Sequence, residues 1–124
     1  MWYTPCVDES RRQPILSVVF YKTASGNEPV REWLLRLPRE DRRAIGFDVK
    51  TAQHGWPLGM PLIRKMEPDL WEVRSHIGSG IARVMFTVEG STMVLLHGFV
   101  KKSGKTLAAD LKTARQRLAD LRKE

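Results

Sequence analysis

The second half of the chain contains the feature that constrains the fold most: three strand-like runs separated by two short loops, with apolar and polar side chains alternating in the first two runs. In Leu70–Ile77 and Ile81–Val88, apolar and polar side chains follow each other with a period of two. Residues 78–80 and 89–91 separate the runs, and loops this short join antiparallel strands. Met93–Val100 is almost wholly apolar, as in a central strand covered on both faces. The sequence therefore predicts a three-stranded antiparallel meander.

The elements on either side of this meander complete the expected fold. Residues 15–21 are β-branched and aromatic and predict a strand. Asn27 is placed to cap a first helix with Pro29 in its first turn. A second helix is expected over residues 39–54, and a last one from Thr106 onward, with leucines at helical spacing. The expected class is α+β, with a small antiparallel sheet of an N-terminal strand plus the meander, two N-terminal helices and a C-terminal helix.

Length and composition limit the organisation of the chain. Its 124 residues fit one domain, expected over residues 15–124, after a flexible leader of residues 1–14 that holds two prolines. The single cysteine, Cys6, excludes an internal disulfide framework and a cysteine-based zinc site. No apolar run is long enough to span a bilayer, and the first residues do not form a secretory signal. We expect a cytoplasmic protein with no membrane partner.

Positive charge gathers in the second half of the chain. The whole sequence holds 21 Lys and Arg against 14 Asp and Glu, a net charge of +7. Residues 1–60 contain 9 basic and 7 acidic side chains, whereas residues 61–124 contain 12 and 7. Such an excess favours polyanions, above all nucleic acid, because phosphate contacts dominate nucleic-acid affinity. The alternative is a solvated basic surface that serves solubility.

The basic segment after the meander is a candidate anion site. It ends in Gly104-Lys105-Thr106 but lacks the earlier glycine of a nucleotide-binding loop, because Phe99 stands at that position. Lys101, Lys102 and Lys105 nevertheless precede an expected helix N-terminus, where free amides and the helix dipole favour an anion. A solvated loop is the alternative.

Three strand residues are candidates for chemistry. Arg74 and Arg83 lie mid-strand on neighbouring strands, which is costly unless their face meets solvent, a ligand or a partner such as Glu72. His97 is either a hydrogen-bonded core residue or an acid–base group. A two-residue loop before the last strand would place His97 opposite the face of Arg83, and a three-residue loop would place both on one face.

Neither a metal site nor a cofactor is predicted. The acidic residues are scattered, and His54, His76 and His97 lack ligand spacing. RNA cleavage by such a chain would use attack of the ribose 2′-hydroxyl on the neighbouring phosphate. That route needs a base, cations for the phosphorane charge and an acid for the leaving oxygen.

Several segments, taken in order, resemble the RelE/ParE toxin superfamily, and most closely its HigB-like, phage-derived branch. They are Val19–Tyr21 with Gly26–Trp33, Leu70–Arg74, Ala82–Phe86, and Val94–Lys102 with Lys105 and Thr106. The likeness covers roughly residues 16–118 and implies a compact α+β fold with a curved antiparallel sheet. It implies the toxin of a type II toxin–antitoxin system, usually one that cleaves mRNA in the ribosomal A site. Its partners would be the cognate antitoxin, the ribosome and mRNA.

The same resemblance implies site residues. Arg83 matches the strand arginine that faces the scissile phosphate, Arg74 a basic catalytic residue of the preceding strand, and His97 an acid–base group. Lys101 and Lys102 match basic residues at the end of the last strand, Lys105 follows them in the same basic loop, and Lys65 is placed to reach the RNA backbone. One departure is that both tyrosines, Tyr3 and Tyr21, are N-terminal, whereas some members have a C-terminal active-site tyrosine.

Other function classes stay open at this point. The ParE arm of the superfamily inhibits gyrase, a phage remnant could bind an antitoxin without catalysis, and a simple nucleic-acid-binding module would explain the charge. For the nuclease, we expect Arg83→Ala to keep the fold and to remove toxicity.

Overall fold

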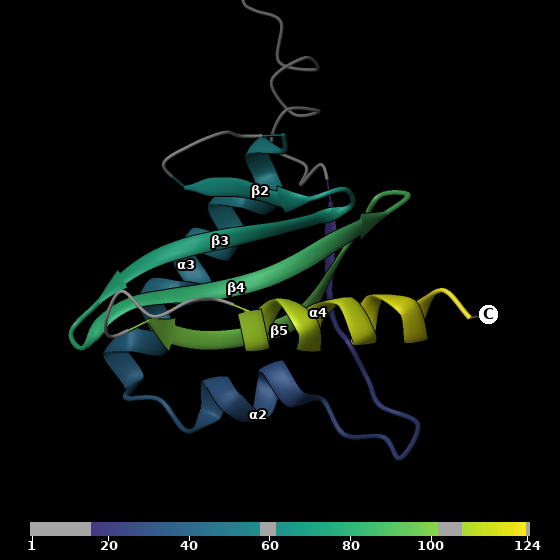
Figure 1. Ribbon diagram of the computed structural model, residues 1–124. Coiled ribbons are helices and arrows are strands. Elements are labelled where there is room, and N and C mark those ends of the chain that lie inside the picture. The colour runs from purple at the N-terminus through teal and green to yellow at the C-terminus, as the bar shows by residue number, and fades with distance from the viewer. Residues whose placement is uncertain (1–15, 58–61, 102–107, 124) are drawn as a thin grey trace, which may run out of the picture.

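The computed structural model describes residues 16–57, 62–101 and 108–123. Its elements in chain order are β1 (Ser17–Phe20), α2 (Pro29–Leu35), α3 (Arg39–Gly55), β2 (Ile63–Glu67), β3 (Leu70–Ile77), β4 (Gly80–Glu89), β5 (Thr92–Lys101) and α4 (Ala108–Leu121). The strands form one open, curved sheet in the order β1-β5-β4-β3-β2 (Figure 1). The expected leader, residues 1–14, lies outside the described residues, as do Lys102, Lys105 and Thr106.

The α+β class and the meander are confirmed. β3, β4 and β5 pair antiparallel in chain order, and β5 lies between β4 and β1 near the middle of the sheet. Glu89 pairs with Thr92, so the loop between β4 and β5 has two residues. Its first residue, Gly90, has a φ of 63°, a left-handed conformation that glycine adopts without steric cost.

The sheet differs from the expected one in two respects. It has a fifth strand, β2, which pairs antiparallel with β3. It is also mixed rather than purely antiparallel, because β1 runs parallel to β5, with Val19 opposite Val94. A parallel partner is possible here because two helices and three strands separate β1 from β5, so no hairpin fixes their relative direction.

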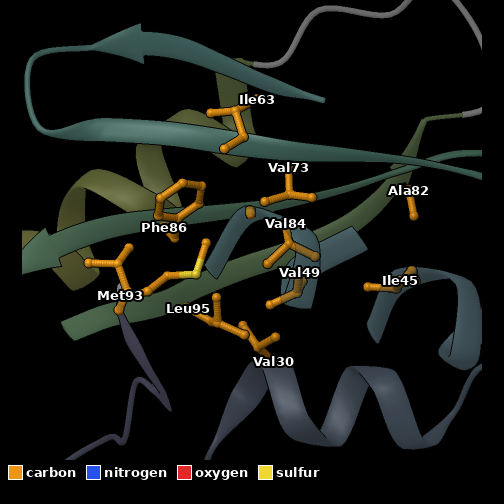
Figure 2. Close-up of a cluster of buried hydrophobic side chains, with 12 residues drawn as sticks. Val30, Ile45, Val49, Ile63, Val73, Ala82, Val84, Phe86, Met93 and Leu95 are labelled. Carbon is orange, nitrogen blue, oxygen red and sulfur yellow. The ribbon is translucent and has the colours of Figure 1, made fainter. Parts of the chain in front are cut away.

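Helices α2 and α3 cover one face of the sheet and enclose the main core (Figure 2). Val30 of α2 and Ile45 of α3 are buried there against strand residues such as Phe86. Trp33 packs so closely on β5 that a Cβ at Gly98 would lie 2.4 Å from its ring. The expected cap at Asn27 is wrong: Glu28 is the N-cap residue of α2, and Asn27 bonds to Thr23 within the preceding turn.

Helix α4 covers the opposite face of the sheet, so the described chain forms three layers (Figure 1). The core under α4 is smaller and contains Tyr21, Met85, Leu96 and Ala114. Ala114 is the only residue of α4 that is fully buried among those described. Leu111, Leu118 and Leu121 pack partly buried against this core, and polar contacts join α4 to the sheet beside the residues that the sequence suggested for chemistry.

Candidate functional site

The sheet face under α4 gathers most of the candidate residues, and we call it the α4 face. Directly paired residues of antiparallel strands project to the same side. Arg74 pairs with Arg83, and Met85, which packs against α4, pairs with His97. By the same pairing and alternation, the residues of this face in β2 to β5 include Arg64, Glu72, Arg74, His76, Ile81, Arg83, Met85, His97, Phe99 and Lys101.

Arg83 is buried in an ion pair. Its Nη1 donates to Oε2 of Glu72 over 3.0 Å, and the two side chains are 4% and 0% exposed. The structure thus gives Arg83 the partner that the sequence offered as an alternative to RNA. Removal of one member of a buried pair leaves a charge without compensation, so the expectation that Arg83→Ala keeps the fold intact does not follow from this geometry.

Arg74 is the more open of the two arginines. With Asp48, Leu62 and His76 it lines a pocket of about 190 Å³ at the edge of β3. Its Nε is nevertheless buried and has no partner within the described part of the chain, and the same holds for Nε of Arg83 and Oε1 of Glu72. Buried polar atoms are nearly always hydrogen-bonded, so this part of the α4 face has unused hydrogen-bonding capacity, two donors of which belong to arginines.

A β-bulge decides the position of His97. The two-residue loop alone would place His97 on the face opposite Arg83. The register shifts by one residue, however, since Phe86 pairs with Leu95 and Met85 with His97. Leu96 is the extra residue in β5, so Leu96 and His97 both project to the α4 face. The bulge therefore places His97 on the same face as Arg83, which the sequence analysis expected only from a three-residue loop.

The ring of His97 is held by two neighbours. Its Nε2 lies 2.7 Å from Oδ1 of Asp110, in the first turn of α4, and the ring stacks on Phe99 with centroids 5.6 Å apart. The side chains of His97 and Asp110 are 17% and 28% exposed. His97 is thus a hydrogen-bonded residue that solvent can still reach, unlike Arg83.

The lysines suggested by sequence are not all brought together. Lys101 lies on the α4 face at the end of β5 and is partly buried. Lys65 pairs with Trp71, whose ring packs in the core under α2 and α3, so Lys65 projects from the other face. Arg64, its neighbour, pairs with Glu72 and lies on the α4 face. Lys102 and Lys105 lie outside the described residues.

Two arginines of α4, and Arg122 directly after the helix, bind groups of the chain itself. Arg115 forms two hydrogen bonds to Glu67, at 2.8 and 2.7 Å, which lower the pKa of that carboxyl below its ordinary value. Arg122 bonds to Glu89 and Asp69. Arg117 donates to the Leu96 carbonyl over 2.8 Å; burial lowers its pKa. These cations attach α4 to the sheet, so the basic surface of this helix is smaller than its sequence suggests.

Tyr21 lies on the α4 face although it is far from the C-terminus in sequence. Its hydroxyl donates to Asp120 of α4 over 2.5 Å, and the guanidinium of Arg117 lies 5.8 Å from its ring centroid. The hydrogen bond to Asp120, together with burial, raises the pKa of Tyr21 above 10. Tyr21 thus fixes the C-terminal part of α4 to the sheet.

No group of three His, Cys, Asp or Glu residues within 16–57, 62–101 and 108–123 is arranged to hold a metal ion. Among the helices of the same ranges, none is long and apolar enough to cross a membrane.

The family described as phage derived protein Gp49-like (DUF891) matches residues 32–119, from α2 through most of α4. No curated protein matches the chain. The matched range contains the residues of the α4 face in β2 to β5 and Asp110, but not Tyr21 or Asp120.

Proposed function

Since the chain belongs to the family of phage-derived Gp49-like proteins, we propose that it is the toxin of a type II toxin–antitoxin system and cleaves mRNA on the ribosome. This family stands in the context of RelE-like toxin–antitoxin systems. The observation that carries the proposal is the composition of the α4 face. Two arginines lie side by side on neighbouring strands, and a bulge brings a partly exposed histidine to the same face.

The proposed chemistry needs no group beyond the protein and the RNA. His97 accepts the proton of a ribose 2′-hydroxyl, the 2′-oxygen forms a bond to the adjacent phosphorus, and the bond from phosphorus to the 5′-oxygen breaks. The departing 5′-oxygen takes a proton from an acid on the same face or from water. Arg74 and Arg83 offset the charge that develops on the phosphoryl oxygens. The products are a 2′,3′-cyclic phosphate and a 5′-hydroxyl end.

RNA binding is proposed to follow the solvent-accessible cations of the α4 face. Arg64 and Lys101 lie on it, whereas Lys65 projects from the opposite face. We therefore assign to Arg64 the backbone contact that the resemblance gave to Lys65. Lys102 and Lys105 follow Lys101 in the sequence, and we propose for them the phosphate binding that the sequence predicts.

Arg64 and Lys65 form a matched pair that tests this placement. Both are exposed and neighbours in β2, but they lie on opposite faces. Arg64→Ala should weaken RNA binding because it removes one phosphate contact. The slope of log K against log salt concentration should become shallower by roughly 0.7 to 0.9. Lys65→Ala should leave both unchanged. Equal losses in the two variants would contradict the placement of RNA on the α4 face.

Induced expression in bacteria, followed by primer extension on cellular mRNA, tests the function itself. The native chain should arrest growth and produce cuts in phase with codons. His97→Ala should produce neither, while His54→Ala, on α3, should behave like the native chain. Growth arrest without cuts would contradict the nuclease.

One observation favours a second function, that of a non-catalytic toxin or of a phage remnant that only binds an antitoxin. The side chain of Arg83 is 4% exposed and already paired with Glu72, so a phosphate reaches it only if the α4 face opens. A chain that binds its antitoxin but produces no cuts, with or without gyrase-linked DNA breaks, would support this alternative.

A further inference from the structure

The contact between His97 and Asp110 joins the sheet to α4 at a partly exposed point. It links residues 13 positions apart through one short hydrogen bond of 2.7 Å between Nε2 and Oδ1. Polar side-chain contacts elsewhere along α4 and at its end include arginines bonded to carboxylates or to a backbone carbonyl, and Tyr21 bonded to Asp120. The imidazole–carboxylate contact therefore differs from them in chemistry, because an imidazole can both accept and donate a proton.

The chemistry of the two groups fixes the tautomer of the ring. An ionised carboxylate only accepts hydrogen bonds, so Nε2 must carry the proton in this contact. In the neutral ring the lone pair then lies on Nδ1, and Nδ1 is the atom that can accept a proton from a substrate. Stacking on Phe99, with an interplanar angle of 23°, further restricts the orientation of the ring.

We infer that Asp110 is the positioning residue of His97 and that α4 is thereby part of the active site. The inference rests on the proposed function, because it gives His97 the role of general base. The Asp110 carboxylate keeps the lone pair on Nδ1 and stabilises the imidazolium that forms when Nδ1 takes the 2′-hydroxyl proton. Asp110 itself touches neither RNA nor the reacting atoms.

The role of α4 follows from this pair. The helix is attached to the sheet at its far end by Tyr21 with Asp120 and by Arg122 with Glu89. These contacts hold the helix across β5, and Asp110 acts on His97 from its first turn. Any partner that lifts the start of α4 from the sheet would separate the base from its carboxylate and lower activity without touching the strand residues.

Nitrogen NMR of the histidine rings tests the pair without any need for activity. In the native chain, the neutral imidazole ring of His97 should carry its proton on Nε2. Asp110→Ala should lose this preference, and Asp110→Asn should keep it, since the amide oxygen can still accept from Nε2. A native ring with the proton on Nδ1, or a tautomer that is unchanged in Asp110→Ala, would overturn the inference even if the chain cleaves RNA.

Single-turnover cleavage on programmed ribosomes tests the catalytic consequence. Asp110→Ala should lower the cleavage rate about 10- to 100-fold, the effect of losing one hydrogen bond to a charged group, with little change in the RNA concentration needed for half-maximal rate. Asp110→Asn should recover part of this loss. Free imidazole should restore cleavage to His97→Ala, but much less to the double variant that also lacks Asp110.

Arg115→Ala is the matched control, because it removes another contact between α4 and the sheet, to Glu67, and leaves His97 untouched. It should cleave within about two-fold of the native chain, since exposed ion pairs contribute little. A loss as large as that of Asp110→Ala would mean that Asp110 only attaches the helix, and would overturn the inference. A native chain that is folded but inactive would refute the proposed function instead. The NMR result alone would then show whether Asp110 sets the tautomer of His97.

Discussion

Replacing the buried pair of Glu72 and Arg83 should reveal how strongly the α4 face depends on it. One hydrogen bond of 3.0 Å joins the two side chains, which are 0% and 4% exposed, while Oε1 of Glu72 and Nε of Arg83 have no partner among the described residues. Removal of either partner leaves a buried charge, which costs about 3 to 5 kcal/mol. A domain of this size has about 5 to 15 kcal/mol in total, so Arg83→Met and Glu72→Leu should each lose a large part of it, as should Arg83→Ala.

The double replacement should behave differently. In Glu72→Leu with Arg83→Met no charge is left behind, and apolar side chains of similar combined volume fill the space. Since the native pair satisfies only part of its hydrogen-bonding capacity, the double variant should be as stable as the native chain or up to about 4 kcal/mol more stable. The coupling energy of the cycle should then exceed the cost of either single change.

Urea denaturation at pH 7, followed by circular dichroism and tryptophan fluorescence, measures the stability of the native chain, of Glu72→Leu, of Arg83→Met and of the double variant. Single variants that cost less than about 1 kcal/mol, or a double variant that costs the sum of the two, would refute this account of the pair. The result also bears on function, because loss of toxicity in Arg83→Ala could then reflect unfolding. Arg83→Lys, which keeps the charge but not the forked guanidinium, is the better variant for testing catalysis.

Two further predictions concern the attachment of the helices. In Gly98→Ala, the new Cβ would lie 2.4 Å from the ring of Trp33, so the variant should lose about 1 to 3 kcal/mol, seen as a lower urea midpoint with altered tryptophan fluorescence; an unchanged midpoint would contradict the close packing of α2. The hydrogen bond to Asp120 raises the pKa of Tyr21 in the folded state, so the stability that this bond contributes is complete below pH 10 and declines as pH rises through the folded pKa. The difference in urea midpoint between the native chain and Tyr21→Phe should therefore shrink from pH 8 to pH 11. A constant difference would argue against that hydrogen bond.

Local patterns were sufficient for much of the fold. The second helix was expected over residues 39–54 and spans Arg39–Gly55, and the three strands of the meander lie within two residues of their expected bounds. These elements have a clear period of two or of 3.6, ended by glycine, proline or polar turns. The neighbouring positions of Arg74 and Arg83 followed from the short turn alone.

Local patterns could not predict the features that depend on how distant parts of the chain pair or pack. β2 was missed because it is short and mostly polar, with Arg64, Lys65 and Glu67 among its five residues; recognising it as a strand would have separated Arg64 from Lys65 by face. The bulge at Leu96 has no sequence signal, since the residues before His97 are uniformly apolar.

The contacts of α4 could not be predicted either. They require the position of a helix relative to strands that are far away in sequence, as in the contact between Tyr21 and Asp120, 99 residues apart. The expected cap at Asn27 failed for a local reason instead, because its backbone is used in the preceding turn.

Cleavage of a defined mRNA on purified ribosomes tests the central claim most directly. The substrate carries an ordinary ribose or a single 2′-deoxyribose at the mapped cut, and product ends are identified by mass spectrometry. We predict cleavage of the all-ribose RNA to a 2′,3′-cyclic phosphate and a 5′-hydroxyl, none at the deoxy position, and the same rate when the magnesium ions are replaced by a cobalt hexammine complex that preserves the ribosome. Intact RNA in the presence of folded protein, a 5′-phosphate product, or cleavage at the deoxy position would contradict the account.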